Sequence, residues 1–354
     1  MGYFPNASNY HNDIAGWKPV RGGIMDFTYL DNLSSAYAES RILHAAVELN
    51  IFDAIGDTRA SAQEVSLKLH TDERATLLFL NALTALNLLR KEDNLFSLTE
   101  LARKYLLSTS ETCYTGMVRF ESAMWSVWGD LAGAIRTGKP VRVPDRYQTD
   151  REETESFIMA MHHLVSARGD AGYIAARLCS EGSRSLLDIG SGPGTYPIAI
   201  CKKDPDMGIT IFDLPGTLEV TRRVLSREGI DQQIQLIAGD YNKDPLPGGF
   251  DIVFLSNIIH GEDEEANMAL MKKIYHSVNP GGSIIIKDHI LNEDLTRPAC
   301  GAIFSIYMLL TTKGRDYGYH EVHRWLEEAG FVDIAREELP PPMTSSLVSG
   351  RRGA

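Results

Sequence analysis

The chain is poor in cysteine and offers no cysteine-based scaffold. Only four of its 354 residues are cysteine, Cys113, Cys179, Cys201 and Cys300, and none is spaced as a CxxC pair or a zinc-ligand set. A chain of this length can bury a core that folds without disulfides or a structural metal. We therefore expect free thiols in a reducing compartment, and no metal site.

Long apolar segments are also missing. The most apolar stretch, residues 75–89, is interrupted by Asn81, Thr84 and Asn87, and it is shorter than the ~18 residues that a membrane span needs. The N-terminal segment MGYFPNASNYHNDIAGWKP lacks the basic start and apolar block of a signal peptide. These features predict a cytoplasmic protein without a membrane partner.

Basic residues are outnumbered. The chain has 35 Lys and Arg against 47 Asp and Glu, which gives a formal charge of −12. Such a chain repels phosphate backbones, so nucleic acid is not an expected partner. The remaining composition, 44% hydrophobic and 23% charged, is ordinary for a soluble globular protein, and the length indicates about two domains.

Residues 1–115 are predicted to form a small helical domain. The sequence Ser61-Ala-Gln-Glu64 is a capping box that opens one helix, and Thr71 is expected to cap a second. Residues 88–98 then hold two short apolar runs around Asp93-Asn94, which is typical of a hairpin.

The order of helix, helix and hairpin is that of a winged helix, a fold that often binds DNA. In residues 1–115, however, acidic side chains outnumber basic ones, and the basic side chains form no stripe. A packing or dimerisation role is therefore favoured over DNA binding for this domain.

Residues 116–178 are expected to be connecting helices. They are rich in large, soft side chains, including Met124, Trp128 and Met161. Such residues usually form core, but their density next to a candidate active domain makes a ligand pocket a reasonable expectation for some of them.

From residue 179 to the end the pattern changes to α/β. Apolar runs such as SLLDIG, ITIFDLP, IQLIAGD, FDIVFLSNII and SIIIKDHI alternate with helical patterns. This alternation predicts a mostly parallel sheet with helices packed against it.

A glycine loop follows the first of these strands. Residues 188–194 read Asp-Ile-Gly-Ser-Gly-Pro-Gly, and Thr195 stands where a dinucleotide-binding loop has its third glycine or alanine. A carboxylate at Asp188 would repel a pyrophosphate, so a nicotinamide-dependent oxidoreductase is disfavoured. Two more acids, Asp213 and Asp240, follow the next two strands, and Asp213 is placed to accept ribose hydroxyls. Three acids at successive strand ends describe a site for a cationic nucleoside.

These residues resemble the S-adenosylmethionine site of class I methyltransferases. The stretch IIHGEDEEANMALMKKIYHSVNPGGSIIIKDHIL further resembles the dimerising small-molecule O-methyltransferases of the caffeate, acetylserotonin and antibiotic-tailoring type. The resemblance implies a Rossmann-like domain with a mostly parallel seven-stranded sheet, preceded by a winged-helix dimerisation domain. It also implies S-adenosylmethionine as donor, S-adenosylhomocysteine as product, a small-molecule substrate, and a homodimer formed through the N-terminal domain.

The family's functional residues carry over to specific positions of this chain. Gly190 would pack against the methionine moiety, and Tyr241 would flank the adenine. The expected cofactor residues are Asp188, Gly190, Gly192, Asp213, Leu214, Asp240, Tyr241 and Ser256. In plant-type members a lysine stands at the position of Ser256.

The catalytic residues that the resemblance implies are His260 as general base, with Asp288 and Asp316 as the acids that orient it. Plant-type members have glutamate at both acidic positions, so each carboxylate here reaches one methylene less far. The family's HDWxDE segment reads His-Gly-Glu-Asp-Glu-Glu in residues 260–265.

If the family geometry holds, the acceptor pocket is apolar and aromatic. The expected lining residues are Met124, Trp128, Met161, Phe304, Tyr307 and Met308. A hydroxyl acceptor is favoured because a phenol, with a pKa near 10, benefits from a base, and the resemblance implies His260 as that base. Sulfur, nitrogen and carbon acceptors remain open, as does a transcriptional regulator that senses the donor through a degenerate domain.

Overall fold

The computed structural model describes residues 26–142, 150–179 and 183–354. The N-terminal segment in which we expect no signal peptide lies outside the described residues. The chain divides into two compact units, residues 1–125 and 126–354. The first unit thus includes the helix over 115–123, most of which we expect in the connecting region of residues 116–178.

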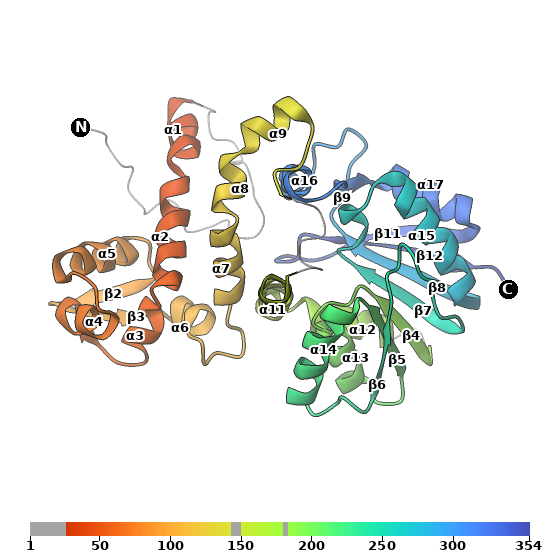
Figure 1. The fold of residues 1–354 in the computed structure, drawn as a ribbon, viewed down its shortest axis with the longest axis horizontal. Coiled ribbons are helices and arrows are strands. Elements are labelled where there is room, and N and C mark those ends of the chain that lie inside the picture. Colours follow the sequence, from red (N-terminus) through yellow and green to blue (C-terminus); the bar gives the residue numbers. More distant parts are fainter. Residues whose placement is uncertain (1–25, 143–149, 180–182) are drawn as a thin grey trace. The chain divides into compact units, whose positions relative to one another are not determined.

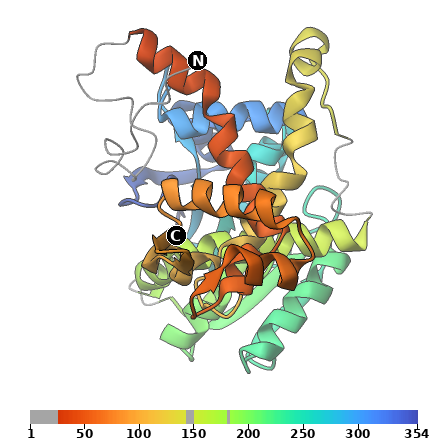
Figure 2. The same ribbon diagram turned by 90° about the vertical axis from the view of Figure 1, so that its left-hand side faces the viewer.

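The N-terminal unit is mainly helical and contains a small sheet (Figures 1 and 2). Its elements are α1 (Phe27–Ser35), α2 (Tyr37–Glu48), α3 (Ile51–Ile55), β1 (Ala60–Ser61), α4 (Ala62–Leu69), α5 (Glu73–Ala85), β2 (Leu89–Glu92), β3 (Leu95–Leu98), α6 (Glu100–Leu106) and α7 (Thr115–Ala123). The three strands form an antiparallel sheet in the order β1-β3-β2. This arrangement of helices and hairpin confirms the predicted winged helix.

Local signals set the ends of these helices. The Ser61–Glu64 capping box is present at the start of α4, and the hairpin turns at Asp93, whose φ is +53°. The prediction for α5 is wrong by one residue: Asp72 caps this helix by accepting from the Ala75 N–H. The Thr71 hydroxyl instead pairs with that of Thr76.

The second unit is a sheet covered by helices on both faces (Figure 1). Its elements are α8 (Trp125–Gly129), α9 (Leu131–Thr137), α11 (Arg151–Arg168), α12 (Asp170–Cys179), β4 (Ser185–Ile189), α13 (Thr195–Lys203), β5 (Gly208–Asp213), α14 (Pro215–Arg227), β6 (Ile234–Ala238), β7 (Phe250–Ser256), η2 (Ile259–Gly261), α15 (Glu264–Ser277), β8 (Val278–Asp288), β9 (Ile290–Leu291), α16 (Ala299–Thr311), β10 (Tyr317–Gly318), α17 (Tyr319–Ala329), β11 (Phe331–Glu338) and β12 (Ser346–Arg352). Strands β9 and β10 form a separate short parallel pair.

The main sheet has seven strands in the order β11-β12-β8-β7-β4-β5-β6. All neighbouring pairs from β8 to β6 are parallel, and β12 is antiparallel to both of its neighbours. Consecutive residues of a strand point to opposite faces, so Leu186 packs into one core with α12, α13 and α14, whereas Leu187 packs into another with α15 and α17. The predicted mostly parallel, Rossmann-like sheet is therefore confirmed.

The topology places the loops of interest at one edge. The chain runs outward from β4 through β5 and β6 on one side, and β7 and β8 lie on the other side. The order therefore reverses beside β4, and ligands of open α/β sheets bind outside the carboxyl ends of strands at such a switch point. The glycine loop follows β4, and His260 follows β7.

Two further predictions concern the chain as a whole. Among the described helices, none combines the length and the apolar character needed to cross a bilayer. The four cysteines are unpaired, and Cys113 and Cys201 are buried.

Candidate active site

The glycine loop between β4 and α13 is shaped by backbone angles that favour glycine. Gly190, Gly192 and Gly194 have φ values of +67°, +59° and +77°, which residues with a Cβ rarely adopt. A Cβ on Gly190 would also lie 2.3 Å from Cδ1 of Ile258. The hydroxyl of Thr221 donates to the Gly192 carbonyl at 2.6 Å and ties the loop to α14.

The carboxylate of Asp213 holds this loop from the end of β5. Its two oxygens accept from the backbone N–H groups of Gly192, at 2.8 Å, and Leu214, at 2.7 Å. Burial raises the pKa of Asp213 to about 6, although these two hydrogen bonds oppose the shift. Leu214 is the N-cap residue of α14, so it lies beside Asp213 as expected.

Asp188 is almost fully buried at the carboxyl end of β4. One oxygen accepts from the Ser191 hydroxyl at 2.7 Å, and the other is buried without a hydrogen-bond partner. Burial raises the pKa of Asp188 to about 7, and the Ser191 hydrogen bond opposes the rise. A buried, unpartnered carboxylate oxygen suits a ligand that carries a positive charge, because such a charge would offset the cost of burial.

The loop after β6 carries the third acid. Asp240 accepts from the Asn242 N–H at 2.9 Å and from Lys243 Nζ at 2.8 Å. The Tyr241 hydroxyl donates to Glu262 at 2.9 Å, and its ring lies 3.9 Å from a Cβ built on Gly190. The loop after β6 and the glycine loop are therefore close together. A cavity of about 380 Å³ continues from Asp240 and Tyr241 towards α15.

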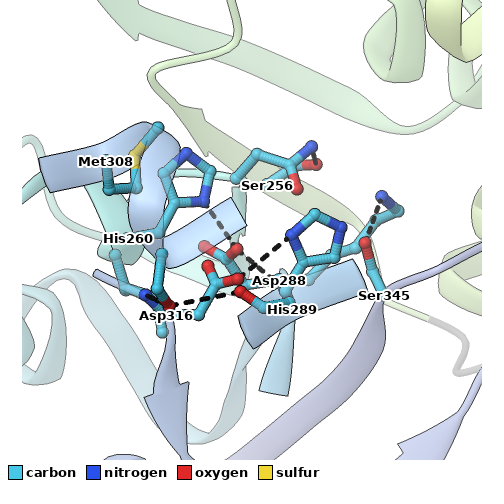
Figure 3. A network of polar contacts seen from close by, with 12 residues as sticks. Ser256, His260, Asp288, His289, Met308, Asp316 and Ser345 are labelled. Atoms are coloured by element: carbon cyan, nitrogen blue, oxygen red, sulfur yellow. Dashed lines mark hydrogen bonds and ion pairs between the residues drawn. The ribbon is translucent and has the colours of Figure 1, made fainter. Parts of the chain in front are cut away.

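His260 and Asp288 form the central pair of the site. His260 lies in η2, and its Nδ1 is 2.7 Å from Oδ1 of Asp288, the last residue of β8 (Figure 3). Asp288 is fully buried. Burial would lower the pKa of His260, but the Asp288 charge and hydrogen bond outweigh it, so this pKa is raised. Burial would raise the pKa of Asp288, but the charge and hydrogen bond of His260 outweigh it, so the pKa of Asp288 lies below its usual value.

Gly314 packs directly against the backbone of His260 and Glu262. A Cβ on Gly314 would lie 2.2 Å from the carbonyl oxygen of His260 and 2.6 Å from that of Glu262. Both contacts are with backbone atoms, which cannot rotate away. Only glycine fits there while the backbone carrying His260 keeps its place.

Asp316 lies in the same cluster but does not hydrogen bond to His260. Both of its oxygens are buried without a hydrogen-bond partner, and Oδ2 faces Nδ1 of His289 at 3.5 Å. The expected direct orientation of His260 by Asp316 is thus not matched by a hydrogen bond, since this carboxylate faces a different imidazole. Burial and the nearby Asp288 charge raise the pKa of Asp316 to about 8.

The cluster has the composition of a possible metal site, but its geometry is that of a hydrogen bond. Candidate ligand atoms of His260, Asp288 and Asp316 lie within 4.8 Å of one another. The 2.7 Å contact between His260 and Asp288 is already a normal charge-assisted hydrogen bond, so we assign no metal.

A chain of aromatic rings starts next to His260. The Phe304 ring lies edge-on to the His260 ring, with centroids 4.9 Å apart. It also contacts Tyr307 at 5.5 Å, and Tyr307 stacks with Trp128 at 6.3 Å. Met308, one residue further along α16, is drawn beside His260 in Figure 3. The structure therefore brings four of the six expected pocket residues together.

Three further expected residues make none of these ring contacts. Met161 is half-buried on α11, and Met124 is buried in the N-terminal unit at the end of α7. Ser256 ends β7 and accepts a long hydrogen bond from the side chain of Asn257.

Several residues of the site are not among the predicted ones. Ser191 and Thr221 hydrogen bond to Asp188 and Gly192 at the glycine loop, Glu262 accepts from Tyr241 in the loop after β6, and His162 hydrogen bonds to Thr195 at 2.9 Å. Ser191 lies inside the glycine motif, so its neighbourhood could have pointed to it. Thr221 and His162 carry no local sequence signal.

Comparisons with known proteins agree with this architecture. The family model of the O-methyltransferase domain matches residues 128–332, and that of the O-methyltransferase dimerisation domain matches residues 32–108. A 3-hydroxy-5-methyl-1-naphthoate 3-O-methyltransferase from Streptomyces sahachiroi is 29% identical over 328 residues, covering 91% of this chain and 94% of the relative. An N,N-dimethyltransferase, OxyT from Streptomyces rimosus, is 25% identical over 311 residues, covering 84% and 89%.

A solved structure of human N-acetylserotonin methyltransferase in complex with S-adenosylmethionine is also similar. It superposes with a TM-score of 0.84 at 25% identity, covering 94% of this chain and 99% of that one. The fold and the site are those of an S-adenosylmethionine-dependent methyltransferase, not of a nicotinamide-dependent oxidoreductase. The chain belongs to the O-methyltransferase family with an N-terminal dimerisation domain.

Proposed function

We propose that the protein transfers a methyl group from S-adenosylmethionine to a hydroxyl of a small aromatic molecule, with His260 as general base. The observation that carries this proposal is the 2.7 Å contact between His260 Nδ1 and the buried carboxylate of Asp288. An ionised carboxylate only accepts hydrogen bonds, so Nδ1 carries the proton. Nε2 is then left with a free lone pair.

That lone pair can take the proton of a hydroxyl acceptor as the oxygen attacks. S-adenosylmethionine supplies a methyl group on a positively charged sulfur. Asp288 stabilises the imidazolium that forms on His260, in the same way that a buried aspartate supports the histidine of a serine protease. Asp188, Asp213 and the glycine loop would hold the donor, and the unpartnered oxygen of Asp188 suits its positive end.

The aromatic rings next to His260 favour a flat acceptor. Phe304 and Tyr307 lie between His260 and Trp128, and rings of this kind bind aromatic ligands by stacking and edge contacts. The relative from Streptomyces sahachiroi is named for a hydroxynaphthoate and the human neighbour for N-acetylserotonin, both hydroxylated or indolic aromatic molecules. A hydroxyarene is therefore the substrate class that we favour.

A nitrogen acceptor is the second candidate, because OxyT is named as an N,N-dimethyltransferase. An amine attacks through its own lone pair, so His260 would contribute less to the rate. Isotopically labelled S-adenosylmethionine offered with separate panels of phenols, amines and thiols, with products identified by mass spectrometry, distinguishes these acceptor atoms.

The first prediction is that His260→Ala lowers turnover of a hydroxyl acceptor about a hundredfold to ten-thousandfold, the usual contribution of a general base. Donor affinity, measured by calorimetry, should change little, because the variant removes only the proton acceptor. His276→Ala, at the exposed end of α15, is the matched control. Full turnover by His260→Ala would refute the base.

We also propose that the chain forms a homodimer through its N-terminal unit. The match to the dimerisation-domain family at residues 32–108 supports this. So does α1, which has no buried residue and exposes Phe27, Leu30 and Leu33.

A further inference from the structure

A second imidazole lies beside the first and is not used by the chemistry proposed above. His289 directly follows Asp288, and its ring also lies edge-on to Phe304, with centroids 4.9 Å apart. Its Nε2 is 3.0 Å from the Thr344 hydroxyl, and its Nδ1 is 3.5 Å from Oδ2 of Asp316. The site therefore holds two imidazole–carboxylate pairs, His260 with Asp288 and His289 with Asp316 (Figure 3).

The hydrogen-bond donors around His289 determine which nitrogen carries its proton. Arg168, at the end of α11, donates from Nη1 to the Thr344 hydroxyl oxygen at 2.9 Å. A guanidinium can only donate, so the hydroxyl accepts from Arg168 and is free to direct its own hydrogen at His289 Nε2. Burial lowers the pKa of His289 to about 4, so the ring is neutral near pH 7. A neutral ring that accepts at Nε2 has its proton on Nδ1, facing Asp316.

We propose that Arg168, Thr344 and His289 are positioning residues whose hydrogen-bond chain presents an N–H to Asp316 and so keeps a carboxylate beside the base. This inference rests on the proposed role of His260. The three residues come from α11, the segment before β12 and the segment after β8, and Arg168 is 176 positions from Thr344. Arg168 is itself anchored 3.8 Å from the buried carboxylate of Asp170.

The consequence for the base is electrostatic. Asp316 is buried, which disfavours its charge, and an N–H aimed at its oxygen favours that charge. An ionised Asp316 within 4.8 Å of His260 stabilises the imidazolium formed during proton abstraction. Other charged or titratable groups lie around His260 and Asp316. They are Asp288 and Lys287 of β8, Arg168 of α11, Cys300 of α16, and Arg315 with its partner Glu321. None of these groups hydrogen bonds to a carboxylate oxygen of Asp316; Arg315 donates only to its backbone carbonyl, at 3.1 Å.

The deciding experiment measures the tautomer and the pKa of each histidine ring. The full chain, labelled with ¹⁵N-histidine and without any ligand, is titrated by long-range ¹H–¹⁵N NMR, and resonances are assigned by single substitution. In the wild type, His289 should be neutral with its proton on Nδ1. Thr344→Val removes the hydroxyl at nearly constant volume and should release this tautomer. Asp316 then loses its donor and its charge, and the pKa of His260 should fall by about one pH unit.

Thr344→Ser is the matched control because it keeps the hydroxyl, so the tautomer and the His260 pKa should remain those of the wild type. A proton on Nε2 of His289 in the wild type would overturn the proposal. An unchanged His260 pKa in Thr344→Val would also overturn it.

A second pair of variants separates positioning from packing. His289→Asn keeps an N–H near the Nδ1 position and should preserve the His260 pKa, whereas His289→Leu should lower it as Thr344→Val does. Equal shifts in both variants would assign His289 a packing role only. These readouts need no acceptor and no turnover, so they can fail or succeed independently of the His260→Ala experiment.

Discussion

At the scale of single residues, the site depends on which carboxylate meets which imidazole. Asp288 contacts His260 at 2.7 Å, whereas Asp316 faces His289 at 3.5 Å. Against the effect of burial, the contact with His260 lowers the pKa of Asp288, whereas burial raises that of Asp316 to about 8, so the charge of Asp316 near pH 7 depends on a donor such as the proposed His289 N–H. Near pH 7, Asp288 is the carboxylate that holds the base.

This difference predicts a pH dependence. Only the neutral imidazole of His260 can accept a proton, so kcat/KM should fall as the pH drops through the His260 pKa. Because that pKa is raised, the acid limb of the wild-type profile should lie above pH 6.5. Asp288→Asn removes the charge that raises it, so the limb should move to lower pH by about one to two units. Turnover should also fall, because the imidazolium loses its support.

The matched control for that prediction is Asp333→Asn, which removes a carboxylate from an exposed ion pair with Arg351. Its pH profile should coincide with the wild-type profile. A profile of Asp288→Asn that also coincides with it would show that Asp288 does not set the charge state of the base.

At the scale of elements, parallel strands explain which residues could be predicted. Their carboxyl ends meet at one edge of the sheet, so acids that follow successive strands in the sequence predict one site. Asp188, Asp213 and Asp240 all follow this rule. So does the pairing of His260 with Asp288, since β7 and β8 are neighbours.

Contacts set by side-chain length and tertiary packing could not be predicted in this way. Asp316 faces His289, which its place in the sequence does not indicate, and the Arg168–Thr344 contact joins two segments with no shared local pattern. The cap of α5 shows the same limit at short range. Thr71 and Asp72 are both good capping residues, and the backbone angle at Asp72 (φ −68°, ψ 130°) decides between them.

The glycine loop allows a prediction at this scale. Gly190→Ala would strain a backbone at φ +67° and place a methyl group against Ile258 and near Tyr241. We expect the affinity for S-adenosylmethionine, measured by calorimetry, to fall at least about tenfold, which corresponds to ~1.4 kcal/mol.

Gly229→Ala is the control for strain alone, because Gly229 has φ +71° but no atom within 4 Å of a built Cβ. It should lower the melting temperature and leave donor affinity unchanged. If Gly190→Ala bound the donor as tightly as the wild type, the glycine loop would not contact it.

At the scale of the whole molecule, each of the two units has its own core. Eighteen buried apolar residues form the core of the N-terminal unit, and two larger clusters fill the faces of the main sheet. The chain length predicted about two domains, and the change from a helical to an alternating α/β pattern along the sequence placed the boundary between them. The surface of α1 is the exception, since its apolar residues contribute to no core.

That surface predicts the oligomeric state. Phe27, Leu30 and Leu33 expose 78%, 61% and 49% of their surface, and they follow one another at helical spacing along α1. An apolar stripe of this kind is stabilised by burial against a partner. The wild type should therefore elute with twice its chain mass of 39.3 kDa in size-exclusion chromatography with light scattering. The double variant Leu30→Asp, Leu33→Asp should shift towards the monomer, because association would bury two charges.

The matched control is Val332→Asp, at a residue of β11 that is 46% exposed, and this variant should stay dimeric. A monomeric wild type would refute the homodimer, and a dimeric double variant would place its interface elsewhere than on α1.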